Sequence, residues 1–111
     1  MIERSIFLDR IGISITFWIG QDAKDNFDIL ERAEPTDLWF HVYNEPSCHV
    51  IAHIPGIMDR NDLRLIRTCG AVVCREHSKK SSKTQIICAK VENVIKGTRV
   101  GQVHVDKYRL I

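Results

Sequence analysis

The sequence of 111 residues predicts an α+β fold, namely one two-layer domain in which a mostly antiparallel sheet packs against one short and one long helix. Three observations lead to this fold class. Short runs of alternating apolar and polar residues recur near both ends of the chain, as in β hairpins. One stretch in the middle keeps helical spacing for about six turns. The length and the composition, 44% apolar and 27% charged, fit a single globular domain over residues 1–111.

The N-terminal third predicts a hairpin and then the short helix. Residues 5–19 form the hairpin, with Gly12 near its turn. The buried side of its second strand consists of Ile13, Ile15, Phe17 and Ile19. Residues 24–33 have helical spacing, and Pro35 prevents the helix from continuing.

The next two strands, residues 38–43 and 49–54, form a pair whose two faces differ. Because side chains alternate along a strand, one face is ordinary apolar core, with Leu38, Phe40, Val42, Val50, Ala52 and Ile54. The other face carries Trp39, His41, Tyr43, His49, Ile51 and His53. Such a face either packs beneath another element or offers rings that stack on bases or riboses.

The long helix is expected over residues 59–80, with one packed and one basic side. At 100° per residue its packed half contains Leu65, Ile66, Cys69, Gly70, Val72 and Val73. The opposite half contains an arginine ridge, which we define as Arg60, Arg64, Arg67 and Arg75. The ridge is either a solvated face or a phosphate-binding surface.

The C-terminal part predicts a basic turn and three strands. The turn SKKSSK contains Lys79, Lys80 and Lys83. Residues 84–91 form one strand, and we expect residues 101–106 and 108–111 to close the chain as a hairpin.

The charges are unevenly distributed along the chain. Residues 1–57 contain 4 basic and 9 acidic side chains, a net charge of −5, whereas residues 58–111 contain 12 and 5, a net charge of +7. This asymmetry indicates a polyanionic partner for the second half. The first ten residues carry charges where an export signal would be apolar, and no apolar run approaches a membrane span, so we expect a cytoplasmic protein.

Catalytic and metal-binding patterns are weak. The sequence has no G-x-S-x-G and no Gly-rich phosphate loop, and Cys48 and His49 would point to opposite faces of a strand. We therefore expect no enzymatic activity and no cofactor. Zinc binding by His49 and His53 with a thiolate is the metal alternative, but the spacing of the four cysteines is irregular. We expect all four cysteines to be reduced.

The stretches WIGQDAKDNFDIL and PTDLWFHVYNEPSCHVI contain three motifs that together resemble the NFACT-R domain, the RNA-binding module of ribosome-quality-control factors and of small coiled-coil proteins. In that family a strand ending in Gly precedes a polar segment with an Asn, here Gly20 and Asn26. The motif D-x-W-F-H-V is matched by Asp37, Trp39, Phe40, His41 and Val42. The segment P-G-S-H-V is matched by Pro46, Ser47, Cys48, His49 and Val50.

The resemblance covers about residues 13–111 and is looser toward the end, where VENVIKGTRVGQVHV aligns with the family's basic segment and last strands. It departs at Ser47, where the family has Gly. Serine tolerates positive φ poorly, so the family's turn geometry is not expected there. Gln21 also replaces a basic residue. Asp37 is expected either to orient His41 and raise its pKa or to accept backbone hydrogen bonds at the start of the strand.

The resemblance implies binding of tRNA or of ribosomal RNA on the large subunit. Because the chain ends at Ile111, we expect RNA binding without the peptide tailing of the full-length factors. The expected contacts are Trp39, His41, His49, Arg60, Arg64, Arg67, Lys79, Lys80, Lys83, Lys96 and Arg99. The alternative is a protein-interaction domain that docks on a ribosome-associated partner through its aromatic and histidine face.

Overall fold

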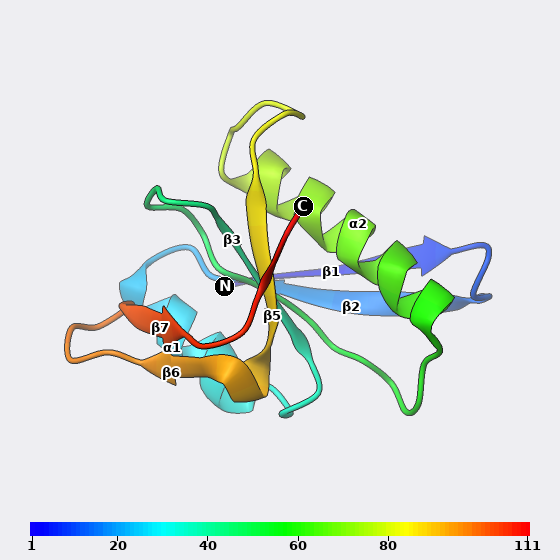
Figure 1. The fold of residues 1–111 in the computed structure, drawn as a ribbon, viewed down its shortest axis with the longest axis horizontal. Helices are drawn as coiled ribbons and strands as arrows, with labels where there is room; N and C mark the ends of the chain where they lie inside the picture. Colours follow the sequence, from blue (N-terminus) through cyan, green and yellow to red (C-terminus); the bar gives the residue numbers. More distant parts are fainter.

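The computed structural model describes all 111 residues and contains two α-helices and eight strands (Figure 1). In chain order the elements are β1 (Ile2–Leu8), β2 (Ile13–Ile19), α1 (Ala23–Arg32), β3 (Leu38–Val42), β4 (Val50–Ala52), α2 (Arg60–His77), β5 (Ile86–Lys90), β6 (Val94–Lys96), β7 (Val103–Val105) and β8 (Arg109–Leu110). The α+β class and the mostly antiparallel sheet are thus confirmed. Each helix begins at an aspartate whose side chain caps it: Asp22 accepts from Asp25 N, and Asp59 accepts from Asp62 N.

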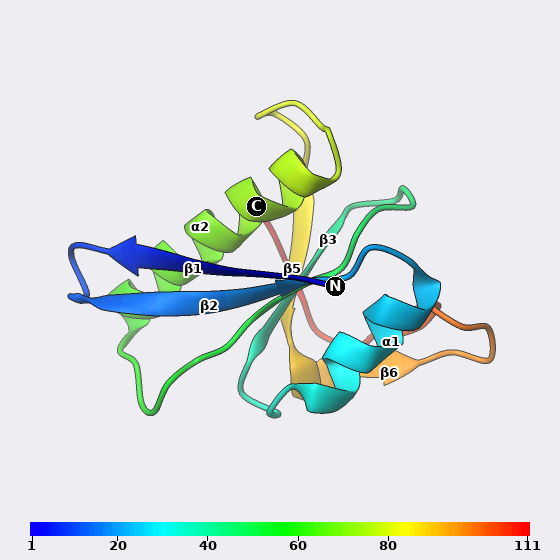
Figure 2. The ribbon, with the colours of Figure 1, turned by 180° about the vertical axis from the view of Figure 1, so that it is seen from behind.

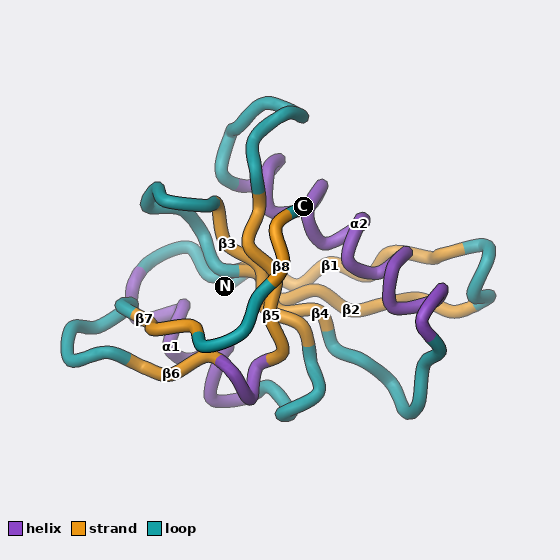
Figure 3. Tube along the Cα trace, viewed as in Figure 1, coloured by secondary structure: helices purple, strands orange, loops and turns teal.

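Six strands form the main sheet, in the order β1-β2-β4-β3-β5-β8, and every neighbouring pair is antiparallel (Figure 3). The strands β6 and β7 form a separate two-stranded hairpin. Gly12 has a φ of 77° in the turn between β1 and β2, a conformation that glycine adopts without steric cost. The β3–β4 pair, which carries the two dissimilar faces, lies in the middle of this sheet.

The helix α2 covers one face of the main sheet (Figure 1). This core contains all six residues predicted for the apolar face of the β3–β4 pair, together with Ile66, Val73 and Cys74 of the helix. Gly70 brings the helix backbone close to β3, because a Cβ at this position would lie 2.2 Å from the Phe40 ring. A glycine is therefore required for α2 to pack at this depth.

The other face is covered as well, at one end, by α1 and the β6–β7 hairpin (Figure 2). The second core contains Ile29 and Leu30 of α1, Val94 of β6, and Trp39 and Ile51 of the sheet. Trp39 is 2% exposed and Ile51 is fully buried. Trp39 and Ile51 therefore belong to a second core, whereas His41, Tyr43 and His53 on the same face are half-buried.

Two expectations about local structure are wrong. The strands expected as a closing hairpin separate: β7 pairs with β6, and β8 pairs with β5 at the edge of the main sheet. The packed side of α2 is also rotated from the predicted one. Val72 is 44% exposed, whereas Ala71 and Cys74 are fully buried. Helical spacing identifies an apolar half but not the part of it that faces the sheet, because single apolar side chains such as Val72 are common on protein surfaces.

This rotation changes the position of the arginine ridge. Arg60 and Arg64 are exposed, but Arg67 and Arg75 lie beside the packed stripe and are half-buried. Arg75 donates from Nε to Thr84 O at 2.7 Å and from Nη2 to Ile111 O at 3.1 Å. Arg75 therefore connects α2 to the residues before β5 and to the end of the chain.

None of the helices is long and apolar enough to cross a bilayer.

Candidate nucleic-acid interface

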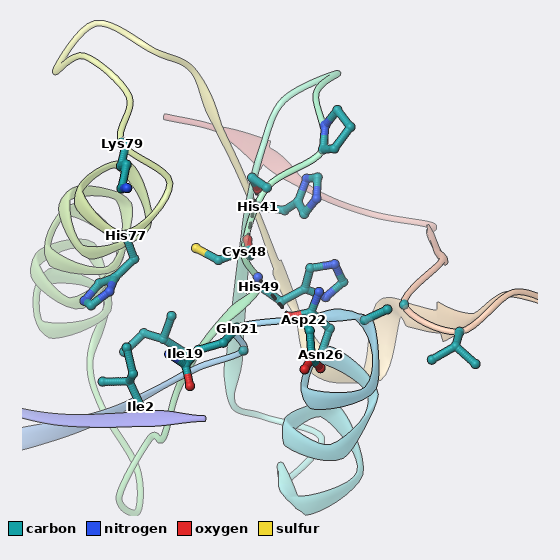
Figure 4. Close-up of a pocket in the computed structure, with 16 residues that line it drawn as sticks. Ile2, Ile19, Gln21, Asp22, Asn26, His41, Cys48, His49, His77 and Lys79 are labelled. Atoms are coloured by element: carbon teal, nitrogen blue, oxygen red, sulfur yellow. Dashed lines mark hydrogen bonds between the residues drawn. The ribbon is translucent and has the colours of Figure 1, made fainter.

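A cavity of about 690 Å³ lies where several distant segments meet, and we call it the histidine cavity (Figure 4). Its wall comes from the end of β2 and the start of α1, the loop from β3 to β4, the residues just after α2, and the turn between β6 and β7. His41, His49 and Lys79, three of the residues predicted to contact RNA, line it. An adjoining hollow of about 390 Å³ shares His41 and His49 and is bounded by β7.

Gly20 and Asn26, the glycine and asparagine of the first motif, hold this wall together. A Cβ on Gly20 would lie 2.1 Å from Asn26 Oδ1, so only glycine lets α1 approach the end of β2. Asn26 Oδ1 accepts from His49 N at 3.3 Å, and Gly20 N donates to His49 O at 2.9 Å. The two residues therefore position His49 from opposite sides.

A hydrogen bond fixes the tautomer of His49. Trp39 Nε1 donates to His49 Nδ1 at 3.2 Å inside the protein, so this imidazole nitrogen is the acceptor. Burial and, to a smaller extent, the neighbouring His41 lower the pKa of His49 to about 3. The neutral ring therefore carries its proton on Nε2 at physiological pH.

His41 has the opposite arrangement. Its Nδ1 donates to Val42 O at 2.6 Å, and burial lowers its pKa, so the neutral ring leaves Nε2 as an acceptor. The His41 ring stacks on Trp39, with 5.6 Å between centroids and 9° between planes. It meets the His49 ring edge to face at 4.9 Å. The cluster thus presents one unused donor and one unused acceptor on neighbouring rings.

The β3–β4 loop accommodates serine at the family's glycine position without positive φ at that residue. The positive φ, 59°, falls on Asn44 instead. Ser47 Oγ accepts from Val42 N at 3.0 Å and donates to Cys48 O at 2.9 Å, which closes the loop through side-chain bonds. Ser47 and Cys48 then form part of the cavity wall.

Cys48 is the most acidic thiol of the chain. A hydrogen bond with Cys74 lowers the pKa of Cys48 to about 7, with a further contribution from Ser78, whose Oγ lies 3.1 Å from Cys48 Sγ. Burial raises the pKa of Cys88 to about 12. All four cysteines are free.

Asp37 is bound to the backbone and to a different histidine from the one expected. Its carboxylate is fully buried and accepts from Glu34 N and Ile54 N, both at 2.8 Å. His53, not His41, lies beside it, with Nδ1 3.2 Å from Asp37 Oδ1. Asp37 therefore supports the start of β3 and the end of β4.

The two histidines of the zinc alternative, His49 and His53, form hydrogen bonds with different neighbours. His49 is bound to Trp39, whereas His53 is bound to Asp37 and lies against Trp18, with 5.8 Å between ring centroids. No group of three or more histidine, cysteine, aspartate or glutamate side chains is arranged to hold a metal ion.

The predicted basic contacts do not converge on one place. Lys79 lines the cavity, whereas Lys80 pairs with Glu45 at 2.8 Å and Lys83 extends into solvent. Lys96 pairs with Glu31 and lies over the Phe27 ring.

The remaining arginines do not line the cavity. Arg99 is exposed in the β6–β7 turn. Arg60, Arg64 and Arg67 lie in the N-terminal half of α2, away from the cavity at its C-terminal end. Burial lowers the pKa of Arg67, and Arg109 nearby adds to the effect.

Sequence reasoning missed His77 and Asn26 as cavity residues. His77 lies on the wall opposite α1, where Nε2 is 3.2 Å from Arg4 Nη1 (Figure 4). No local pattern marks His77, because its role depends on β1 lying beside α2. The first motif marked Asn26, but a motif position alone does not predict whether the side chain lines a cavity or only stabilises the helix.

A family model described as the NFACT protein RNA binding domain matches residues 9–107. The chain therefore belongs to this family of RNA-binding domains, as the motifs around Trp39 and His49 predicted. No curated protein matches the sequence. A similar solved structure is the C-terminal part of the fibronectin/fibrinogen-binding protein from Streptococcus suis, with a TM-score of 0.79 and 21% sequence identity. The match covers 98% of this chain but only 43% of that one, and at this identity it shows a shared fold alone.

Proposed function

We propose that this domain binds tRNA or ribosomal RNA on the large ribosomal subunit, in the cytoplasm and in the context of translation or ribosome quality control. Membership of an RNA-binding family supports RNA as the partner. The observation that carries the proposal is the histidine cavity, whose wall contains two neutral imidazoles with unused polar atoms and, at the end of α2, the side chain of Lys79. Base or ribose contact beside phosphate contact is the combination that RNA recognition requires.

The distribution of free cations supports the same proposal. Arg60, Arg64, Lys79, Lys83 and Arg99 are exposed and form no ion pair within the chain. They are therefore available to neutralise phosphates, whereas Lys80 and Lys96 would first have to leave their carboxylate partners. These groups belong to the half of the chain with a net charge of +7.

The protein-interaction alternative lacks its main feature in this fold. It required an open aromatic and histidine face as an anchor, but Trp39 is 2% and His49 is 3% exposed. A docking surface would have to lie elsewhere. RNA binding is therefore the better supported of the two functions.

The salt dependence of binding tests the proposal. We would measure the affinity for deacylated tRNA and for fragments of large-subunit rRNA by filter binding at several salt concentrations. Because phosphate contacts release counterions, log affinity should fall by about 0.7 to 0.9 per neutralised phosphate for each unit of log salt. A double-stranded DNA of equal charge serves as the control for unspecific attraction. Absence of binding to every RNA at low salt would refute the proposed function.

A further inference from the structure

We propose that the histidine cavity holds a single unstacked nucleotide, with its base against His41 and His49 and its phosphate at Lys79. This inference rests on the proposed function and specifies which part of an RNA the site would take. It concerns one nucleotide in a cavity, whereas the proposed function concerns an RNA on a surface. The two can therefore fail separately.

The first observation is that His49 has an unused donor although the residue is only 3% exposed. The Nδ1 atom is occupied by Trp39, so the proton lies on Nε2, which has no partner in the protein. Every side-chain nitrogen and oxygen that is sealed from solvent has a partner. The Nε2–H group is therefore open to the space that the two imidazoles line, where a ligand acceptor can reach it (Figure 4).

The second observation is the acceptor that stands beside this donor. His41 uses Nδ1 as the donor to Val42 O, which leaves the Nε2 lone pair unused. The two rings are 4.9 Å apart between centroids. His41 lies on β3 and His49 directly precedes β4, which pairs with β3, so their relative position is fixed. A nucleobase edge carries donors and acceptors side by side, and a rigid donor and acceptor pair suits it.

The third observation is the charge at the rim of the cavity. Lys79 follows α2, is exposed and forms no ion pair, so its ammonium group is free to meet a phosphate. Asp22 is the single carboxylate on the wall, and its side chain is used to cap α1. A phosphate is therefore favoured on the side of the cavity formed by the end of α2.

The size of the cavity limits the ligand to a small unit. About 690 Å³ lies within the range of roughly 300 to 1,000 Å³ that is typical of sites for small molecules and cofactors. One nucleotide fits such a volume, but a base pair within a helix does not present its base edge to it. We therefore expect the nucleotide to come from a loop, a bulge or a strand end.

The test is a titration with uridine 5′-monophosphate, the other three ribonucleoside monophosphates and single-stranded pentaribonucleotides, followed by NMR. We expect the indole N–H signal of Trp39 to shift in a saturable way, because Trp39 is bonded to the imidazole that meets the ligand. Trp18 is an internal reference, since its Nε1 donates to Glu3 Oε1 at 2.9 Å and it does not line the cavity.

Matched variants assign the two contacts. His41→Phe keeps a ring over Trp39 but removes the acceptor, and the affinity for the preferred monophosphate should fall about fivefold to tenfold. Lys79→Gln should lower the affinity for the monophosphate by a similar factor and leave the affinity for the corresponding nucleoside unchanged. Lys90→Gln removes the same charge from an exposed residue outside the cavity and should change neither affinity. A thermal melt of each variant establishes that it is folded.

The outcomes separate the inference from the proposed function. A saturable shift of Trp39 that weakens in both cavity variants supports the inference. RNA that binds while the Trp39 signal stays unchanged, or binds equally well to the His41→Phe and Lys79→Gln variants, overturns the inference and leaves RNA binding intact. A protein that binds no RNA and no nucleotide refutes both proposals.

Discussion

At the scale of single residues, the hydrogen bond between Trp39 and His49 links the second core of the domain to its cavity. The indole is packed between β4, β5 and α1 and also selects the tautomer of the imidazole. A tryptophan on a strand can serve as a stacking platform or as core. At 2% exposure Trp39 has no ring face free for stacking on a base, so in the proposed function it acts through His49.

Replacing Trp39 with alanine should therefore act on stability first. We expect the free energy of unfolding to fall by about 3 to 5 kcal/mol, because a large buried side chain is removed and a cavity remains. Urea denaturation followed by circular dichroism measures this. Trp18→Ala, at a half-buried position, is the control and should cost less. A Trp39→Ala protein that keeps its stability and is impaired only in RNA affinity would contradict the core role.

The buried His49 should also make the domain sensitive to mild acid. Its pKa is lowered from 6.5 to about 3 in the folded state, so between these values the unfolded chain binds the extra proton and the folded protein does not. Stability should fall as the pH drops below about 6.5, by at most about 1.4 kcal/mol per pH unit from this group. The lowered pKa of His41 acts in the same direction.

Denaturation midpoints measured from pH 7 to pH 4 would test this acid sensitivity. His49→Gln should be less stable at pH 7, but its stability should decrease less on acidification than that of the parent protein. His104→Gln, at an exposed position on β7, should follow the parent curve. An identical pH dependence in all three proteins would exclude His49 as the cause.

At the scale of elements, the packing of α2 on β3 depends on one glycine. Gly70→Ala should gain helix propensity, worth about 1 kcal/mol, but the new methyl group would overlap the Phe40 ring. We expect a net destabilisation of about 1 to 3 kcal/mol, since the packed core can absorb the overlap only by shifting. Thr68→Ala, at an exposed position of the same helix, should be neutral or slightly stabilising in the same urea experiment.

The elements differ in how well the sequence predicted them. Local patterns located both helices, the first hairpin and the β3–β4 pair, because spacing, Gly12 and Pro35 act within a few residues. They did not predict that β7 and β8 have different partners, since strand pairing is decided by elements far away in sequence. For the same reason alternation placed Trp39, His41 and His49 on one face but gave no indication that α1 and the β6–β7 hairpin cover it.

At the scale of the whole molecule, the uneven charge of the chain resolves into two separate basic surfaces. Lys79 and Lys83 lie beyond the C-terminal end of α2, where Lys79 lines the cavity, whereas Arg60 and Arg64 lie at its N-terminal end. The helix has 18 residues and is therefore about 27 Å long. A dinucleotide in the cavity would not reach the arginines, but a folded RNA of the size of tRNA would span both surfaces.

This separation predicts that one double variant distinguishes short from long RNA. Arg60→Glu with Arg64→Glu should leave the affinity for a dinucleotide unchanged but weaken tRNA binding, and it should lower the salt slope of tRNA binding by about 0.7 to 0.9 for each phosphate that is no longer neutralised. Fluorescence anisotropy with both RNAs measures the two effects. Lys90→Glu with Lys107→Glu makes the same charge change on exposed residues outside both surfaces and corrects for net charge. If tRNA binding falls equally in both double variants, the decrease reflects net charge alone, and Arg60 and Arg64 form an ordinary solvated face.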